Sequence, residues 1–423
     1  MNRKKLLLVG GVIALVLAAW VLWPQPADRG NGRFFADDSY NFETARILND
    51  VAAAGGDTGE ALNALGKMRA GDAEIWYRTW TAVADRTLAL AARTQDARSR
   101  GLALLRAHNY YRSAEFFLTP QDPRRAASFK HNVAAFYAGL DTLEVPYERI
   151  VVPYGSHHLN ALYYPGPAGA GSRPLLVVVG GYDSTLEELY FSIGAAALQH
   201  GYSVLTYEGP GQGSVLREQG LHMQADWERP DAVVLDRFLG THAKPKKIVL
   251  LGESLGGYLA PRAAAFDPRI DGVVAFDVWY DGYAIATRQV PAFVFWMRAH
   301  GYERQLNALA TQTSDPGARW AQQNGEWVFG VDTPMAVLDA FKAYGLGPVA
   351  GRIKQDVLLL AGTDDHFVPL SQLEQERKAL VNARSVTAVV FDRASGGSLH
   401  CQIGAPSLWQ ATLFDWMAAK FGG

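Results

Sequence analysis

The fold can be recognised from ten consecutive residues, Ile248-Val249-Leu250-Leu251-Gly252-Glu253-Ser254-Leu255-Gly256-Gly257. The first four form an apolar run that predicts a buried strand. The next five fit the pattern Gly-x-Ser-x-Gly, and the residues after Gly257 predict the start of a helix. A sharp turn between a buried strand and a helix exposes a serine hydroxyl at the end of a sheet. The stretch therefore predicts that Ser254 is a nucleophile, and a purely structural turn is the alternative.

Similar apolar runs occur on both sides of this stretch. They are short, rich in Val, Ile and Leu, and separated by helical segments; they cover residues 175–179, 204–207, 273–276, 357–360 and 387–391. This alternation is typical of a parallel sheet with helices on both faces. Residues 144–153 and 158–164 predict an antiparallel hairpin at the sheet's edge. The fold class predicted for the chain is α/β, with a mostly parallel sheet.

The chain divides into two parts at about residue 142. Residues 34–141 predict an N-terminal all-α domain, because apolar residues recur there at helical spacing. Residues 142–423 carry the alternating strands and helices and predict the catalytic domain. About 80 residues between Asp277 and Val357 contain no clear strand. They predict a helical cap at about residues 282–350, which is a common place for a substrate pocket.

The amino terminus predicts a membrane segment at residues 1–23. A basic cluster at residues 2–5 precedes an uncharged apolar run from Leu6 to Trp23. Such a run predicts an uncleaved signal anchor, a transmembrane helix that leaves the catalytic domain on the periplasmic or extracellular side. A cleaved signal peptide and secretion are the alternative. Residues 24–33 contain Gly and Pro and predict a linker.

Composition excludes several other functions. The 423 residues are 49% hydrophobic and carry a net charge of −2, with Lys and Arg scattered along the chain. This argues against nucleic-acid binding. The partner expected from the cap is a small-molecule substrate. There is one cysteine, Cys401, and no metal-ligand spacing such as His-Glu-x-x-His, so we expect no metal and no cofactor. A homodimer is compatible with the sequence.

A serine nucleophile needs a base and an orienting acid. Where the serine lies on such a strand-to-helix turn of an α/β sheet, the acid follows it in the chain and the histidine comes last. Asp365 follows a predicted strand and is favoured as the acid, with Asp364 as the competitor. His400 lies in a Gly-rich loop before the last helix and is favoured as the base. His366 is interpreted as a solvated loop residue. Cys401 is interpreted as a small buried apolar side chain.

The same logic predicts an oxyanion hole of two backbone N–H groups. Leu255 directly follows the nucleophile and supplies the first. The loop after Val179 supplies the second, from Tyr182 or alternatively from Gly181. The residues that follow, from Asp183 to Thr185, resemble a helix N-cap, and Glu187 and Glu188 would then lie in the first turn.

Several motifs together resemble one group of proteins. They are Gly180-Gly181-Tyr182-Asp183-Ser184-Thr185, Glu208-Gly209-Pro210-Gly211-Gln212-Gly213, Gly252-Glu253-Ser254-Leu255-Gly256-Gly257 and His400-Cys401-Gln402. Over about residues 70 to 420 the chain is similar to the α/β-hydrolases related to dihydroxypseudooxynicotine hydrolase. That group also includes hydrolases of fungal polyketide pathways and the esterase-like fermentation-respiration switch proteins. Glu208, where Asp is commoner, and the N-terminal anchor depart from the pattern.

The resemblance implies an α/β-hydrolase fold with Ser254, Asp365 and His400 as its catalytic triad. It also implies a helical domain that covers the catalytic face and lends residues to the pocket. The candidates for this role are Tyr110, Tyr111, Glu115 and Phe116, and core packing is the alternative for each.

The expected function is hydrolysis through an acyl-enzyme, first of a carboxylic ester with apolar or aromatic character. Cleavage of a C–C bond in a ketone and dipeptidyl or acylaminoacyl peptidase activity are the alternatives. A non-enzymatic alternative is an inactive scaffold that serves as a membrane-tethered binding module. An inactive scaffold would lack a triad residue, whereas Ser254, Asp365 and His400 are all present.

Overall fold

The computed structural model describes residues 34–167 and 170–422. The predicted anchor at residues 1–23 and the linker at residues 24–33 lie outside the described residues. Among the helices that are described, none is long and apolar enough to cross a membrane.

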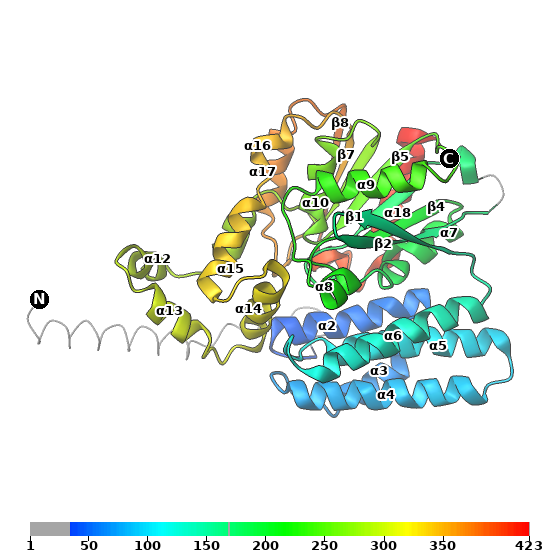
Figure 1. Cartoon of the computed structure of the whole chain (residues 1–423), viewed down its shortest axis with the longest axis horizontal. Coiled ribbons are helices and arrows are strands. Elements are labelled where there is room, and N and C mark those ends of the chain that lie inside the picture. The colour runs from blue at the N-terminus through cyan, green and yellow to red at the C-terminus, as the bar shows by residue number, and fades with distance from the viewer. Residues whose placement is uncertain (1–33, 168–169, 423) are drawn as a thin grey trace, which may run out of the picture.

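A helical domain precedes the sheet and lies against one end of it (Figure 1). Its elements are α2 (Asp38–Asn49), η1 (Asp50–Ala53), α3 (Thr58–Leu65), α4 (Ala73–Arg93), α5 (Ala97–Glu115) and α6 (Pro123–Thr142). Each α-helix begins after an aspartate whose carboxylate accepts a backbone N–H of the first turn; these are Asp37, Asp57, Asp72, Asp96 and Asp122. Aromatic side chains fill its core, where Tyr40 stacks on Phe117 with ring centroids 3.9 Å apart.

The second part of the chain forms one eight-stranded sheet in the order β1-β2-β4-β3-β5-β6-β7-β8. Its strands are β1 (Glu148–Tyr154), β2 (His157–Tyr164), β3 (Leu175–Val179), β4 (Ser203–Glu208), β5 (Ile248–Glu253), β6 (Gly272–Phe276), β7 (Asp356–Gly362) and β8 (Ser385–Phe391). β1 and β2 pair antiparallel as predicted, β2 joins β4 antiparallel, and the strands from β3 to β8 are parallel. This arrangement confirms the predicted fold class.

Both faces of the sheet are buried because alternate residues of a strand enter different cores. In β3, Leu175, Val177 and Val179 belong to a core shared with α9 and α10, whereas Leu176 and Val178 pack in the core that contains α18. The elements that cover the sheet are η3 (Tyr190–Gly194), α7 (Ala195–Gln199), α8 (Gly213–Gln219), α9 (Glu228–Leu239), α10 (Gly256–Ala264), α17 (Ser371–Ala379), η5 (His400–Gln402) and α18 (Pro406–Phe421). A short helical turn, η2 (Ala170–Ser172), lies between β2 and β3.

The insertion between β6 and β7 is helical, and its helices α12 and α13 project away from the sheet (Figure 1). It consists of α11 (Gly282–Thr287), α12 (Ala292–Ala299), α13 (Glu303–Ala310), α14 (Pro316–Phe329), α15 (Pro334–Ala340), η4 (Phe341–Ala343) and α16 (Gly347–Ala350). Trp320 of α14 stacks on Phe116, with ring centroids 4.7 Å apart. The insertion therefore contacts the helical domain, and its residues Val328 and Tyr344 belong to the core on one face of the sheet.

Candidate active site

Ser254 lies at the turn between β5 and α10, with a backbone φ of 58°. Such a φ is uncommon for a residue with a side chain, and it persists only where the surroundings impose it. Two features impose it here. The Ser254 N–H donates to the carbonyl of Phe276 at the end of β6, 2.6 Å away. A Cβ at Gly252 would overlap the carbonyl oxygen of Gly256, so only glycine permits so tight a turn.

The structure brings the three predicted catalytic residues into one hydrogen-bonded chain. His400 Nε2 lies 2.8 Å from Ser254 Oγ, and His400 Nδ1 lies 2.6 Å from Asp365 Oδ2. Asp365 Oδ1 accepts the backbone N–H groups of Phe367 and Val368 at 2.7 and 2.8 Å. The side chains of His400 and Asp365 are only 3% and 2% exposed, so water competes little for these bonds.

The charges of this pair support each other. Burial raises the pKa of the Asp365 carboxyl, but the charge and hydrogen bond of His400 outweigh burial and lower that pKa to about 2. Burial lowers the pKa of His400, and the carboxylate of Asp365 more than reverses this and raises it. Asp365 is therefore ionised at neutral pH and stabilises the protonated imidazole.

The competing residues point to other partners. Asp364 pairs with Arg393, with an N–O distance of 2.7 Å, and so does not serve His400. His366 contacts the ring of Phe42 with centroids 5.4 Å apart. Cys401 is half-buried, and its N–H donates to Asp277 Oδ2 at 2.9 Å.

The predicted oxyanion groups come from two adjacent segments. Leu255 is the N-cap of α10, so its N–H has no carbonyl partner within that helix. The loop of Gly181 and Tyr182 lies directly against it, because a Cβ at Gly181 would meet the Leu255 nitrogen at 2.9 Å. The side chain of Gln212 donates to the carbonyls of Gly180 and Gly181 at 2.7 and 3.2 Å. The loop therefore has a fixed position beside Ser254.

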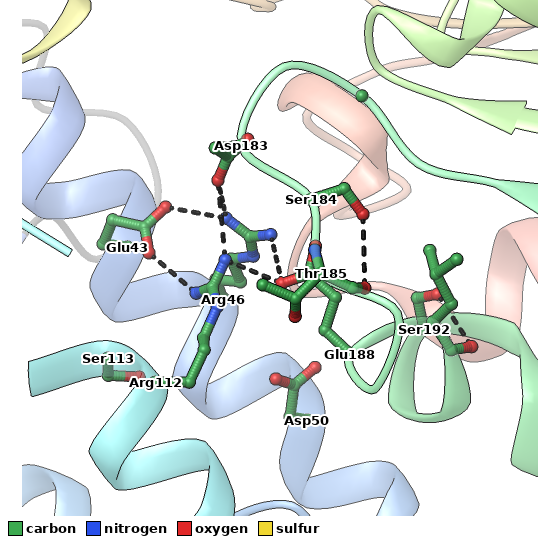
Figure 2. Close-up of polar contacts among 12 residues, drawn as sticks. Glu43, Arg46, Asp50, Arg112, Ser113, Asp183, Ser184, Thr185, Glu188 and Ser192 are labelled. Carbon is green, nitrogen blue, oxygen red and sulfur yellow. Dashed lines mark hydrogen bonds and ion pairs between the residues drawn. The ribbon is translucent and has the colours of Figure 1, made fainter. Parts of the chain in front are cut away.

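The residues after Tyr182 differ from the prediction. Asp183 does not cap a helix, since the next helical segment begins only at Tyr190. Figure 2 shows that Asp183 and Glu188 instead point toward two arginines of the helical domain, Arg46 of α2 and Arg112 of α5. Arg46 lies 2.7 Å from Asp183 and 2.9 Å from Glu188, and Arg112 lies 2.9 Å from Glu188. The acidic residues thus join the loop of Gly181 and Tyr182, called here the oxyanion loop after its predicted role, to the helical domain.

Glu43 completes this cluster from α2. Its carboxylate lies 3.1 Å from both Arg46 and Arg112, and its side chain is 1% exposed. Burial raises the pKa of Asp183, but the charges of Arg46 and Arg112 outweigh burial and lower it. Asp183 is therefore ionised, whereas burial raises the pKa of Glu43. The cluster joins the two domains beside the loop of Gly181 and Tyr182.

The four residues predicted to line the pocket are packed in or beside the helical domain. The Tyr110 hydroxyl donates to Glu60 and the Tyr111 hydroxyl donates to Asp85. Glu115 pairs with Arg125 and Arg217 at 2.9 and 2.7 Å, while Phe116 stacks on Trp320. Within the described residues, these partners do not include Ser254, Asp365 or His400, so a role of the four in substrate binding stays a prediction.

A residue that the sequence did not single out reaches the site instead. The ring of Phe42, on α2, lies 5.8 Å from the ring of His400 and 5.6 Å from that of Phe367. The Tyr182 side chain leads into the cap, where its hydroxyl donates to the Ala321 carbonyl and its ring faces Phe341 at 6.0 Å. Aromatic side chains of both the helical domain and the cap thus surround the oxyanion loop and the histidine.

One group of potential metal ligands lies together in the described part of the chain. It consists of Asp277, His400 and Cys401, whose donor atoms lie within 4.8 Å of one another. Both ring nitrogens of His400 are already engaged, with Ser254 and Asp365. The group therefore belongs to the hydrogen-bonded chain around His400 and does not fit an independent metal site.

Gly257, in the first turn of α10, offers a test of how tightly the site is packed. A Cβ there would overlap the backbone carbonyl oxygen of Asp277, a buried atom that cannot move freely. We expect Gly257→Ala to lower the free energy of unfolding by about 2 to 3 kcal/mol. Urea denaturation measures this. Gly345→Ala is the control, because nothing lies within 4 Å of a Cβ at that position, and an equal loss in both variants would contradict the argument.

Comparison with known proteins agrees with this geometry. Residues 175–401 match the model of the alpha/beta hydrolase family. The chain belongs to the alpha/beta hydrolase family. A hydrolase of Aspergillus aculeatus, acrC, is 35% identical over 92% of this chain and 98% of its own length. The 20-hydroxy-prefusarin hydrolase FUS2 of Gibberella moniliformis is 33% identical over the same shares of the two chains. The protein is thus an enzyme of a hydrolase family whose similarity extends through the helical domain.

A solved structure shares the fold of this alpha/beta hydrolase. The crystal structure of the 2,6-dihydroxy-pseudo-oxynicotine hydrolase has a TM-score of 0.68 and 22% sequence identity, and the match covers 89% of this chain and 95% of that one. The match includes the helical domain as well as the sheet. The fold expected from the motif resemblance is therefore confirmed.

Proposed function

We propose that this alpha/beta hydrolase is a serine hydrolase that works through an acyl-enzyme. The observation that carries the proposal is the buried chain from Asp365 through His400 to Ser254, with hydrogen bonds of 2.6 and 2.8 Å. A hydroxyl next to a histidine that is itself held by a carboxylate is the arrangement that activates serine for acyl transfer.

The steps follow from the positions of these groups. Ser254 Oγ attacks the carbonyl carbon of the substrate while His400 Nε2 takes the hydroxyl proton. The N–H groups of Leu255 and Tyr182 bind the oxyanion of the tetrahedral intermediate. His400 then gives the proton to the leaving alcohol, and the acyl group stays on Ser254. Water, deprotonated by His400, releases the acid and restores the serine.

The surroundings favour a substrate of apolar or aromatic character. Phe42 and Phe367 lie beside His400, and Tyr182 faces Phe341 in the cap. We therefore propose a small carboxylic ester, or a related acyl compound, as the substrate. The bond is not fixed by this machinery, because the same serine could attack a ketone and cleave a C–C bond, or attack a peptide.

Two measurements test the proposal. A fluorophosphonate probe should label Ser254, identified by peptide mass spectrometry. A panel containing an aryl ester, a β-diketone and a dipeptide anilide should give the highest kcat/KM for the ester. Preferred turnover of the diketone would transfer the proposal to C–C hydrolysis. Neither labelling nor turnover would instead favour an inactive binding scaffold.

The location of the enzyme is proposed on sequence alone. We propose that residues 1–23 anchor the chain in a membrane with the catalytic domain exported, and that cleavage and secretion are the alternative. Fractionation of cells that express the full chain should recover it in the membrane pellet, resistant to washing with salt. Recovery in the soluble fraction with residues 1–23 intact would contradict an anchor.

A further inference from the structure

A second carboxyl group adjoins the candidate triad. Asp277 directly follows β6, as Asp365 follows β7, and these strands are neighbours in the sheet. Its Oδ2 lies 3.6 Å from His400 Nδ1, and its side chain is 1% exposed. The proposed mechanism does not use this group. Burial of a carboxyl group costs free energy unless the group is hydrogen-bonded, so Asp277 is expected to have partners.

Asp277 connects to each part of the site. Its Oδ2 accepts the N–H of Cys401 at 2.9 Å and its Oδ1 accepts Gln402 Nε2 at 3.3 Å. Cys401 and Gln402 follow His400 and have positive φ values of 49° and 46°, so this loop needs bonds that impose its shape. The preceding carbonyl, of Phe276, accepts the N–H of Ser254.

We propose that Asp277 is a positioning residue of this site: it holds the His400 loop and Asp365 in place, and it orients His400 itself when Asp365 is removed. The inference rests on the proposed serine-hydrolase function.

The protonation of the two carboxyl groups is consistent with this role. The groups that face Asp277 are Asp365, at the end of β7, and His400 and Cys401, on the loop before α18. Burial and the neighbouring charge of Asp365 raise the pKa of Asp277 well above its usual value, and its hydrogen bond to Asp365 acts in the same direction. A neutral Asp277 donates that hydrogen bond to ionised Asp365. With Asp365 replaced by Asn the neighbouring charge is gone, and Asp277 can then ionise and accept a hydrogen bond from the Nδ1–H of His400.

Four variants test the proposal: Asp277→Asn, Asp277→Ala, Asp365→Asn and the double variant Asp365→Asn/Asp277→Asn. An amide can donate to Asp365 as the neutral carboxyl does, so Asp277→Asn should keep kcat/KM within about threefold of the parent. The acidic limb of its kcat/KM against pH, which reports protonation of His400, should move by less than about half a pH unit. Asp277→Ala should lower kcat by about tenfold or more at unchanged KM.

The second part of the proposal, called here the reserve role, is that Asp277 orients His400 when Asp365 is removed. The comparison of Asp365→Asn with the double variant tests it. The kcat of Asp365→Asn should be at least about tenfold higher than the kcat of the double variant, because a triad without any acid loses about 10⁴ in kcat. Equal activity of these two variants would overturn the reserve role. If Asp277 were instead ionised in the parent enzyme, Asp277→Asn would remove a negative charge beside His400 and lower the pKa of His400. The acidic limb would then move to lower pH by about one unit or more, and this result would overturn the proposal that Asp277 is neutral.

Fluorophosphonate titration of active sites keeps these outcomes separate from the proposed function and from folding. A parent enzyme that neither labels nor turns over esters would reject the serine-hydrolase function itself. An Asp277→Ala enzyme with fewer active sites but an unchanged kcat for each site would reduce Asp277 to a structural residue and overturn the proposal. If Asp277→Ala does not fold, the two isosteric Asn variants still decide the result.

Discussion

Ser254→Ala should lower kcat by about 10⁶, to the level left by binding and the oxyanion groups alone. The expected size follows from the geometry, because Oγ is the only atom removed and it is the atom that His400 Nε2 contacts at 2.8 Å. Labelling by a fluorophosphonate should disappear in the same variant. Initial rates with an aryl ester, corrected for protein concentration, measure the effect.

The control for this experiment is the other nucleophilic side chain beside His400. Burial raises the pKa of the Cys401 thiol to about 11, so little thiolate is available at neutral pH. Cys401→Ala should therefore keep its labelling and an ester hydrolysis rate within about tenfold of the parent enzyme. Retained labelling in Ser254→Ala and its loss in Cys401→Ala would reverse the assignment of the nucleophile.

The second large effect is expected at the contact between the domains. Arg112 is 4% exposed and shares its guanidinium between Glu43 and Glu188, so Arg112→Met removes one of the two arginines that neutralise these carboxylates and leaves them only Arg46. Breaking such a pair costs about 3 to 5 kcal/mol of the free energy of unfolding. Activity should fall as well, because Arg46 alone would then hold Asp183 and Glu188, and with them the loop of Gly181 and Tyr182, against the helical domain. Urea denaturation and kcat measure the two consequences.

An exposed ion pair of the same domain is the matched control. Arg78 pairs with Glu74 at 3.4 Å, and the two side chains are 76% and 50% exposed. Arg78→Ala should therefore change stability by less than about 1 kcal/mol. A similar loss of unfolding free energy in both variants would mean that the contribution of the Arg112 cluster to stability does not depend on its burial. Loss of stability in Arg112→Met with unchanged kcat would separate domain contact from catalysis.

The sequence predicted the sheet and the three hydrogen-bonded residues well, because both depend on local patterns. Each parallel strand is a short apolar run, which is buried whichever strands it pairs with. Ser254 lies in a five-residue turn that has its own sequence pattern. The choice of Asp365 over Asp364 also agrees with the geometry. Their spacing after β7 is the local feature that separates an inward side chain from one that pairs with Arg393.

The features that the sequence did not predict join distant parts of the chain. Arg46 and Asp183 lie 137 residues apart, and the acids after Tyr182 had an ordinary local explanation as a helix start. Phe42 has the spacing of any apolar residue on a helix, and only the packing of α2 brings it to His400. Asp277 is a single polar residue directly after β6, and its contact with His400 depends on the neighbouring order of β6 and β7.

The position of Phe42 has a consequence for how the substrate range of this enzyme can evolve. The groups proposed to make and break bonds lie at the ends of strands of the sheet or on the loop before α18, whereas Phe42 belongs to a separate helix that precedes the sheet in the chain. Substitutions on that helix can reshape the wall of the site without moving Ser254, Asp365 or His400. Mutations in the helical domain can therefore change which substrates fit the site while the proposed reaction stays the same.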